Sequence, residues 1–179
     1  SIRRQRQMCI RDRRGSDQCP GPDPIDLPKN ERLAPEIYRD PSRVCYITIR
    51  AYRNLRPFIE PRLNRRVVEL LRAEQERQRC RVFVYCLMPD HLHLLVSPCE
   101  EGVSALQFVD RFKGRATNES WKCGWKGKLW QPRHYDHVVR GDEDLGAIAV
   151  YVMQNPVRKG LVECPEEWPW GGELNRLPI

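Results

Sequence analysis

The sequence predicts an α+β fold in which helices cover one face of an antiparallel sheet. Short runs of β-branched and aromatic residues alternate with longer segments whose apolar residues recur at helical spacing. Along the 179 residues the predicted order is β-α-β-β-α-β-α. This order matches a ferredoxin-like split βαβ sandwich with one extra C-terminal helix, and the length suits a single domain.

The first half of the domain supplies three strands and one helix. The run VCYITIRAY at 44–52 has the composition of a strand, and 61–79 carries an apolar stripe at helical spacing with Pro61 near its start. RVFVYCLM at 81–88 and HLHLLVS at 91–97 predict two further strands. Only two residues separate them, so we expect a tight hairpin.

The second half supplies two helices and an edge strand. Residues 102–119 repeat apolar side chains at helical intervals, and 129–140 reads as an extended segment in which Pro132 is tolerable at a sheet edge. Residues 142–155 open with acidic side chains and predict the extra helix, which Pro156 is expected to end.

The predicted domain occupies residues 41–172. Residues 1–40 are Pro-rich or lack periodicity, so we expect an extended or disordered tail, and 173–179 forms a second tail. The string RRQRQMCIRDR within residues 1–14 resembles translated adapter sequence, which would make it an artefact. A basic DNA-binding arm is the alternative interpretation.

Charge and composition argue against a membrane protein or a secreted protein and give only modest support for binding to nucleic acid. Residues 1–15 hold six arginines and one aspartate, so they carry most of the net charge of +7, and the predicted domain is only modestly basic. Neither a membrane span nor a secretory signal is indicated, so we expect a cytoplasmic protein, associated with the nucleoid if it binds DNA. The eight cysteines are then expected to stay reduced, and Cys45, Cys80 and Cys86, in or beside the predicted strands, are expected to be small buried residues rather than zinc ligands.

His91 and His93 are the first candidates for chemistry. Residues two apart on a strand point to the same face, so both imidazoles can converge on one ion. Such a pair is a good metal site, although several metal-protein classes share it. The alternative is two hydrogen-bonded histidines at a sheet surface.

Tyr151 and Asn155 are the second pair. On a helix they fall within about 40° of each other, at the border of the apolar face, so both can project toward the sheet. Asn155 would then supply an oxygen ligand while Tyr151 presents its hydroxyl beside the metal. A tyrosine at the rim of the core and a simple helix terminator at the Asn-Pro step are the alternatives.

Four segments in this order carry a family resemblance. They are MPDHLHLLVSP (88–98), LWQPRHYDHVV (129–139), YVMQNPVRKGLV (151–162) and ECPEEWPW (163–170). Together they resemble the REP-associated tyrosine transposases, a branch of the single-tyrosine HUH (IS200-like) transposases, over about residues 41–172. The resemblance implies that His91, His93 and Asn155 bind Mg²⁺ or Mn²⁺ and that Tyr151 is the catalytic nucleophile.

The implied activity is metal-dependent cutting and rejoining of single-stranded DNA at a hairpin or palindromic repeat, through a 5′-phosphotyrosine. A metal beside the tyrosine suits this chemistry, because a phenol with a reference pKa near 10 needs nearby positive charge to act at neutral pH. The resemblance also implies a monomer rather than a homodimer. Two alternatives remain: a domesticated hairpin-binding protein without cleavage, and an HxH metal-dependent hydrolase that uses water.

Basic residues near tryptophans are the candidates for DNA contact, because ammonium and guanidinium groups attract phosphates and aromatic rings stack on bases. The candidates near tryptophans are Lys113, Arg115, Lys122, Lys126 and Lys128. Arg158 and Lys159 are candidates for another reason, because they lie one helical turn beyond the proposed site. The interleaved rings are Trp121, Trp125 and Trp130. A solvated surface with buried tryptophans is the alternative.

Overall fold

A computed structural model describes residues 32–141 and 143–178 and contains one five-stranded sheet. The strands are β1 (Cys45–Arg50), β2 (Cys80–Met88), β3 (His91–Pro98), β4 (Tyr135–Val138) and β5 (Gly171–Glu173). They lie in the order β4-β1-β3-β2-β5, and every neighbouring pair is antiparallel. The first four strands therefore have the order of a split βαβ fold, which confirms the predicted class.

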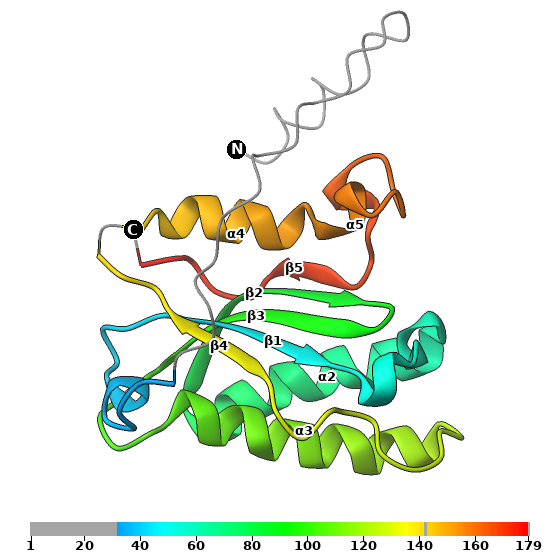
Figure 1. Cartoon of the computed structure of the whole chain (residues 1–179), viewed down its shortest axis with the longest axis horizontal. Coiled ribbons are helices and arrows are strands. Elements are labelled where there is room, and N and C mark those ends of the chain that lie inside the picture. The colour runs from blue at the N-terminus through cyan, green and yellow to red at the C-terminus, as the bar shows by residue number, and fades with distance from the viewer. Residues whose placement is uncertain (1–31, 142, 179) are drawn as a thin grey trace, which may run out of the picture.

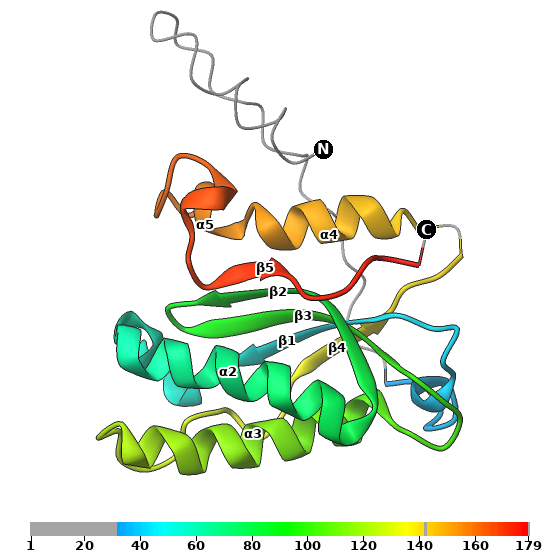
Figure 2. The same cartoon turned by 180° about the vertical axis from the view of Figure 1, so that it is seen from behind.

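Helices cover both faces of this sheet (Figures 1 and 2). One face carries α2 (Pro61–Gln78) and α3 (Ala105–Lys122), the two crossover helices. The other face carries α4 (Leu145–Met153), which is followed at once by the one-turn α5 (Asn155–Arg158). The extra C-terminal helix predicted to carry the tyrosine is thus a third layer of its own.

Four single-turn 3₁₀ helices complete the described elements. They are η1 (Ile37–Arg39), η2 (Tyr52–Asn54), η3 (Pro57–Ile59) and η4 (Pro165–Glu167). Two of them, η2 and η3, fill the connection between β1 and α2. They lie at the end of the sheet where β2 turns into β3 (Figure 1).

Two apolar layers follow from the alternation of side chains along the strands. Leu92 and Leu94 of β3 pack with Phe108 in the layer under α2 and α3. Leu95 packs instead with Val152 in the layer under α4. Because neighbouring residues of a strand point to opposite faces, His93 lies on the same face as Leu95, the face that α4 covers. In both layers, each fully buried large apolar side chain contributes about 1.5–3 kcal/mol to the stability of the fold.

Local signals set the helix boundaries. At the start of α2, the Glu60 carboxylate accepts a hydrogen bond from the Arg62 amide at 3.2 Å. At the start of α4, Asp144 Oδ1 accepts one from the Ala147 amide at 3.0 Å. Both acceptors satisfy amide groups that a helix end leaves without a partner.

The structure differs from the sequence predictions in the C-terminal region. Pro156 does not end the helical path, because it stands in the first turn of α5, where a missing amide hydrogen costs nothing. Within 129–140 only Tyr135–Val138 forms a strand. Strand β5 extends the domain beyond 172, and the Leu174 amide still donates to the Phe83 carbonyl at 2.8 Å.

The N-terminal segment also differs from the expected tail. Tyr38 in η1 is buried, and its hydroxyl donates to the Asp136 carboxylate, so the ordered fold begins before residue 41. The predictions for residues 1–31, including both interpretations of 1–14, lie outside the described residues.

Candidate metal and nucleophile site

The two predicted histidines meet on the α4 face of β3. His91 Nε2 lies 2.9 Å from His93 Nε2. The other nitrogen of His91, Nδ1, lies 2.6 Å from Asp90 Oδ1. Because a carboxylate only accepts, Nδ1 carries the proton of a neutral His91, and its Nε2 presents a lone pair.

Two hydroxyl groups of β1 hold His93. Tyr46 Oη and Thr48 Oγ1 lie 2.8 and 2.9 Å from His93 Nδ1. Thr48 is the cross-strand partner of His93, and Tyr46 precedes it by two residues on the same face. When Nδ1 of His93 carries the proton, its Nε2 has a free lone pair next to the Nε2 lone pair of His91.

Burial keeps both imidazoles neutral. Burial lowers the pKa of His91 below its usual value, against the opposing effect of the Asp90 carboxylate. The pKa of His93 is lowered further, first by burial and then by His91 and Arg158. Neutral imidazole is the form that binds a metal, so both side chains are in the competent form at neutral pH.

Asn155 joins this pair from the start of α5. The residue is buried, and its Nδ2 donates to the backbone carbonyls of Tyr151 and Val152 at 3.0 and 3.2 Å. These two bonds fix the carboxamide, and its side chain lies close enough to His93 to act on the pKa of that imidazole. Its Oδ1 accepts from Arg158 at 2.9 Å.

Tyr151 in the last turns of α4 lies beside Asn155 of α5, which donates to its backbone carbonyl. Its half-buried ring packs into the layer under α4, and the Arg158 guanidinium carbon stands 3.7 Å from the ring centroid. Its phenol lies close enough to Tyr46, the residue that holds His93, to add to the raised pKa of that hydroxyl, after the larger effect of burial. All four predicted site residues therefore lie on one face of the sheet.

The residues present fit a divalent cation. Two nitrogens each about 2.1 Å from an ion, in directions at right angles, lie about 3.0 Å apart, close to the 2.9 Å seen here. The described residues contain no cluster of three His, Cys, Asp or Glu side chains suited to a metal. The third protein donor would be the Asn155 carboxamide oxygen, and a mixed N and O set leaves room for water and a phosphate.

Three of the predicted DNA contacts have other partners. Lys113 is buried and donates to the Pro132 carbonyl at 2.8 Å, which contradicts a role at the surface. Arg115 pairs with Glu74 at 2.6 Å, and Lys122 pairs with Glu119 at 2.7 Å. All three belong to α3, which covers the face opposite the histidines.

The remaining predicted DNA contacts lie either near the two histidines or on the exposed surface. Arg158 touches Tyr151 and Asn155, and Lys159 lies close enough to act on the pKa of His91. Lys126 and Lys128 are exposed in the connection from α3 to β4. Of the interleaved rings, Trp130 is buried against Phe58 and Phe112.

Sequence reasoning missed the residues that support the histidines. Tyr46, Thr48 and Asp90 make the hydrogen bonds that orient them, and Arg50 lies opposite His91 on β1. For the residues on β1, the sequence did carry a signal, because side chains two residues apart on a strand, as at 46, 48 and 50, point to the same face. The pairing register of β1 with β3 was the missing information.

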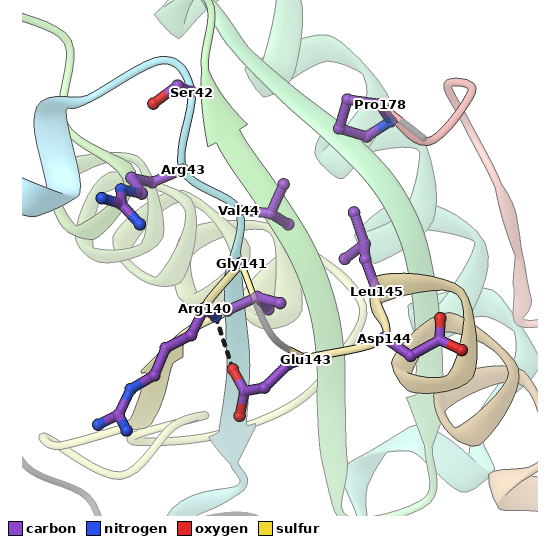
Figure 3. A pocket seen from close by; sticks show the side chains of 10 residues that line it. Ser42, Arg43, Val44, Arg140, Gly141, Glu143, Asp144, Leu145 and Pro178 are labelled. Atoms are coloured by element: carbon purple, nitrogen blue, oxygen red, sulfur yellow. Dashed lines mark hydrogen bonds between the residues drawn. The ribbon is translucent and has the colours of Figure 1, made fainter.

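A concavity lies at the N-terminal end of α4, the end away from Tyr151. Its volume is about 420 Å³, and it is lined by residues 42–44, 139–141, 143–145 and Pro178 (Figure 3). Glu143 accepts there from the Arg140 amide at 2.6 Å and lies 2.9 Å from His137 Nε2. The concavity contains none of the predicted site residues.

A family model described as "Transposase IS200 like" matches residues 42–155, more than half of the chain and the segment that holds all four site residues. The chain belongs to this family. The IS200-like chain is 32% identical over 95 residues to a protein of Haemophilus influenzae named "Putative REP-associated tyrosine transposase". It is 29% identical over 86 residues to a REP-associated tyrosine transposase of Escherichia coli.

These alignments cover 48% of this chain each, and 54% and 50% of the two relatives. The IS200-like chain therefore spans about half the length of the curated relatives it matches. Its fold is also that of a solved REP-associated tyrosine transposase bound to a REP hairpin, with a TM-score of 0.64 over 81% of this chain and 82% of that one. At 19% identity this likeness shows the fold alone. Among the described residues, no helix is long and apolar enough to cross a membrane.

Proposed function

We propose that this chain is a metal-dependent endonuclease and strand transferase that acts on single-stranded DNA with Tyr151 as nucleophile. The observation that carries the proposal is the convergence of His91 Nε2 and His93 Nε2 next to Asn155, on the face that α4 and Tyr151 cover. Family membership supports a DNA-processing role, and the solved relative supports hairpin DNA as the substrate. The supporting hydrogen bonds to each histidine are those of a ligand pair.

The reaction exchanges one phosphodiester for another. The Tyr151 oxygen forms a bond to phosphorus, the bond to the 3′ oxygen breaks, and that oxygen takes up a proton to leave a 3′-OH. The phenol proton goes to solvent. A cation held by His91, His93 and Asn155 would polarise the scissile phosphate and offset its growing negative charge. Attack by a second 3′-OH on the 5′-phosphotyrosine reverses the step and joins strands without ATP.

The chain's own groups position the nucleophile. The Arg158 guanidinium covers the Tyr151 ring and bonds Asn155, so it links the nucleophile to the third proposed ligand. A guanidinium here also attracts a phosphate to the phenol. Lys159 adds a second positive charge near His91.

The test is formation of a covalent adduct. Labelled single-stranded hairpin DNA incubated with Mn²⁺ or Mg²⁺ is expected to give a protein-bound label that survives denaturing electrophoresis. EDTA and Tyr151→Phe should each abolish this label. Tyr85→Phe is the matched control, because Tyr85 is a buried tyrosine in the layer under α2 and α3 and should leave the adduct intact.

Other outcomes separate the alternatives. Cleavage without an adduct favours a hydrolase that activates water, and hairpin binding without cleavage favours a DNA-binding protein. An adduct that persists in Tyr151→Phe removes the proposed nucleophile.

A further inference from the structure

Three positive charges gather around Tyr52 at the end of β1. The Arg53 guanidinium carbon lies 5.3 Å from the centre of the Tyr52 ring, and Lys128 Nζ lies 5.5 Å from it. Arg133 lies on the same concavity, whose volume is about 420 Å³. The residues that line it, called the Tyr52 concavity below, are Tyr52, Arg53, Gln131, Pro132 and Arg133.

Backbone and side-chain hydrogen bonds build this concavity. An isolated β-bridge joins Ala51 to Trp130, and the Tyr52 amide donates to the Leu129 carbonyl at 2.8 Å. Gln131 Nε2 donates to Asn54 Oδ1 at 3.2 Å. Two segments about eighty residues apart in sequence are thereby held together, so the concavity is formed before a ligand arrives.

Among the residues that the structure describes, the positive charges there have no carboxylate partner. Within the described ranges, neither Arg53, Lys128 nor Arg133 forms an ion pair, and all three side chains are exposed. By contrast, Arg66 on the surface of α2 is paired with Glu119 at 2.9 Å. Like charges held close without a counter-ion repel one another, and an anionic ligand would remove that repulsion.

The backbone of the turn is also in an uncommon conformation. Arg53 and Asn54 follow one another with φ of 53° and 56°, in the left-handed region. Residues other than glycine rarely adopt this backbone conformation. Those that do are found more often at binding and catalytic sites, where the function requires the strained backbone. Here the conformation places an arginine, rather than a glycine, beside the concavity.

The Tyr52 concavity lies at the same end of the sheet as the histidines. Arg50, two residues before Tyr52, is the cross-strand partner of His91. The Ala51 amide donates to the Asp90 carbonyl at 2.8 Å, and Asp90 orients His91. In Figure 1 the end of β1, the β2–β3 turn, α5 and the α3–β4 connection all lie at this end. A ligand could therefore reach from the histidines to the concavity past one strand end.

We propose that the Tyr52 concavity binds the single-stranded segment of nucleic acid that adjoins the scissile phosphate, with Arg53, Lys128 and Arg133 contacting its phosphates. The inference rests on the proposed function for DNA as the polyanion. A single strand fits better than a duplex, because its backbone can bend into a concave surface and its bases are free. Trp121, 53% exposed in the last turn of α3 where the α3–β4 connection begins, offers a ring for one of them.

Binding of fluorescent hairpin DNA in EDTA tests the inference apart from catalysis. One probe carries a single-stranded extension, and the other is a blunt hairpin with the same stem. Arg53→Gln/Arg133→Gln is expected to weaken binding of the extended probe about tenfold and to lower the slope of log K against log salt by about 1.4, the share of two single-strand phosphate contacts. Binding of the blunt probe should change less than twofold.

The control is Arg72→Gln/Arg77→Gln, which removes the same charge from exposed positions in the second half of α2. It should bind both probes as the unaltered chain does, and circular dichroism should show both variants folded. Equal loss on both probes would assign the concavity to duplex and overturn the inference. So would unchanged binding, an equal loss in the control, or failure of the unaltered chain to bind the extended probe. Dependence on Arg53 and Arg133 without any covalent adduct would overturn only the proposed function.

Discussion

Removing one buried hydroxyl tests whether the histidine pair is a metal site. Tyr46→Phe deletes the oxygen 2.8 Å from His93 Nδ1 and leaves Thr48 Oγ1, at 2.9 Å, as the remaining contact. The ring should stay in place, because it stacks on His93 with centroids 5.7 Å apart and is fully surrounded. The change therefore removes the hydrogen bond that orients one proposed ligand, together with a longer contact of 3.2 Å from Thr48 Oγ1.

The two readouts should respond differently. One lost hydrogen bond lowers the free energy of unfolding by about 1 kcal/mol, because the second contact persists. Loss of a group that orients a ligand weakens metal affinity about 10- to 100-fold, or about 1.4–2.8 kcal/mol. Mn²⁺ titration by calorimetry and urea unfolding in EDTA measure the two quantities.

Tyr85→Phe is again the control, since it removes a hydroxyl from the opposite layer. Its Mn²⁺ affinity should equal that of the unaltered chain. The reasoning is refuted if Tyr46→Phe binds Mn²⁺ unchanged while its stability falls, because the hydroxyl would then serve only the fold. It is also refuted if both variants lose affinity equally.

Two further predictions concern buried polar groups. Lys113→Met should lower the free energy of unfolding by about 1–3 kcal/mol, because the Pro132 carbonyl loses a charged donor, and DNA affinity measured by anisotropy should not change; weakened DNA binding with unchanged stability would restore Lys113 as a surface contact. Burial, and then the hydrogen bond to Asp136, raise the pKa of Tyr38 from 10 to about 12. The stability that the neutral Tyr38 hydroxyl contributes is complete below pH 10 and is lost as pH rises through about 12. Between these pH values, the free energy of unfolding in urea should fall less steeply for Tyr38→Phe than for the unaltered chain. An equal fall in both proteins would contradict this prediction.

The parts of the fold that sequence reasoning found are those with strong local periodicity. The strand-like runs 81–88 and 91–97, only two residues apart, placed the hairpin, and the apolar stripe of 61–79 placed α2. These patterns depend on residues close to each other in the chain. Strand β5 escaped notice because Gly171–Glu173 has no strand composition and exists only through pairing with β2. Such an element depends on tertiary contacts.

The same division applies to the site. His91 and His93 followed from the strand period, and Tyr151 with Asn155 followed from the helix period and a family resemblance. Lys113 was assigned wrongly, because its position on the buried side of α3 depends on where the helix meets the sheet. The hydroxyls of β1 that hold His93 depend on strand register, which local sequence does not specify.

The position of β3 has a consequence for how the site responds to partial unfolding. This strand has a neighbour along each edge, β1 on one side and β2 on the other, and it carries both histidines. Local opening begins at edges and termini, whereas a strand enclosed on both sides exchanges its amide hydrogens only when the whole domain opens. Fraying of β4 or β5 should therefore leave the imidazole pair intact, and thermal loss of the proposed ion site should coincide with global melting.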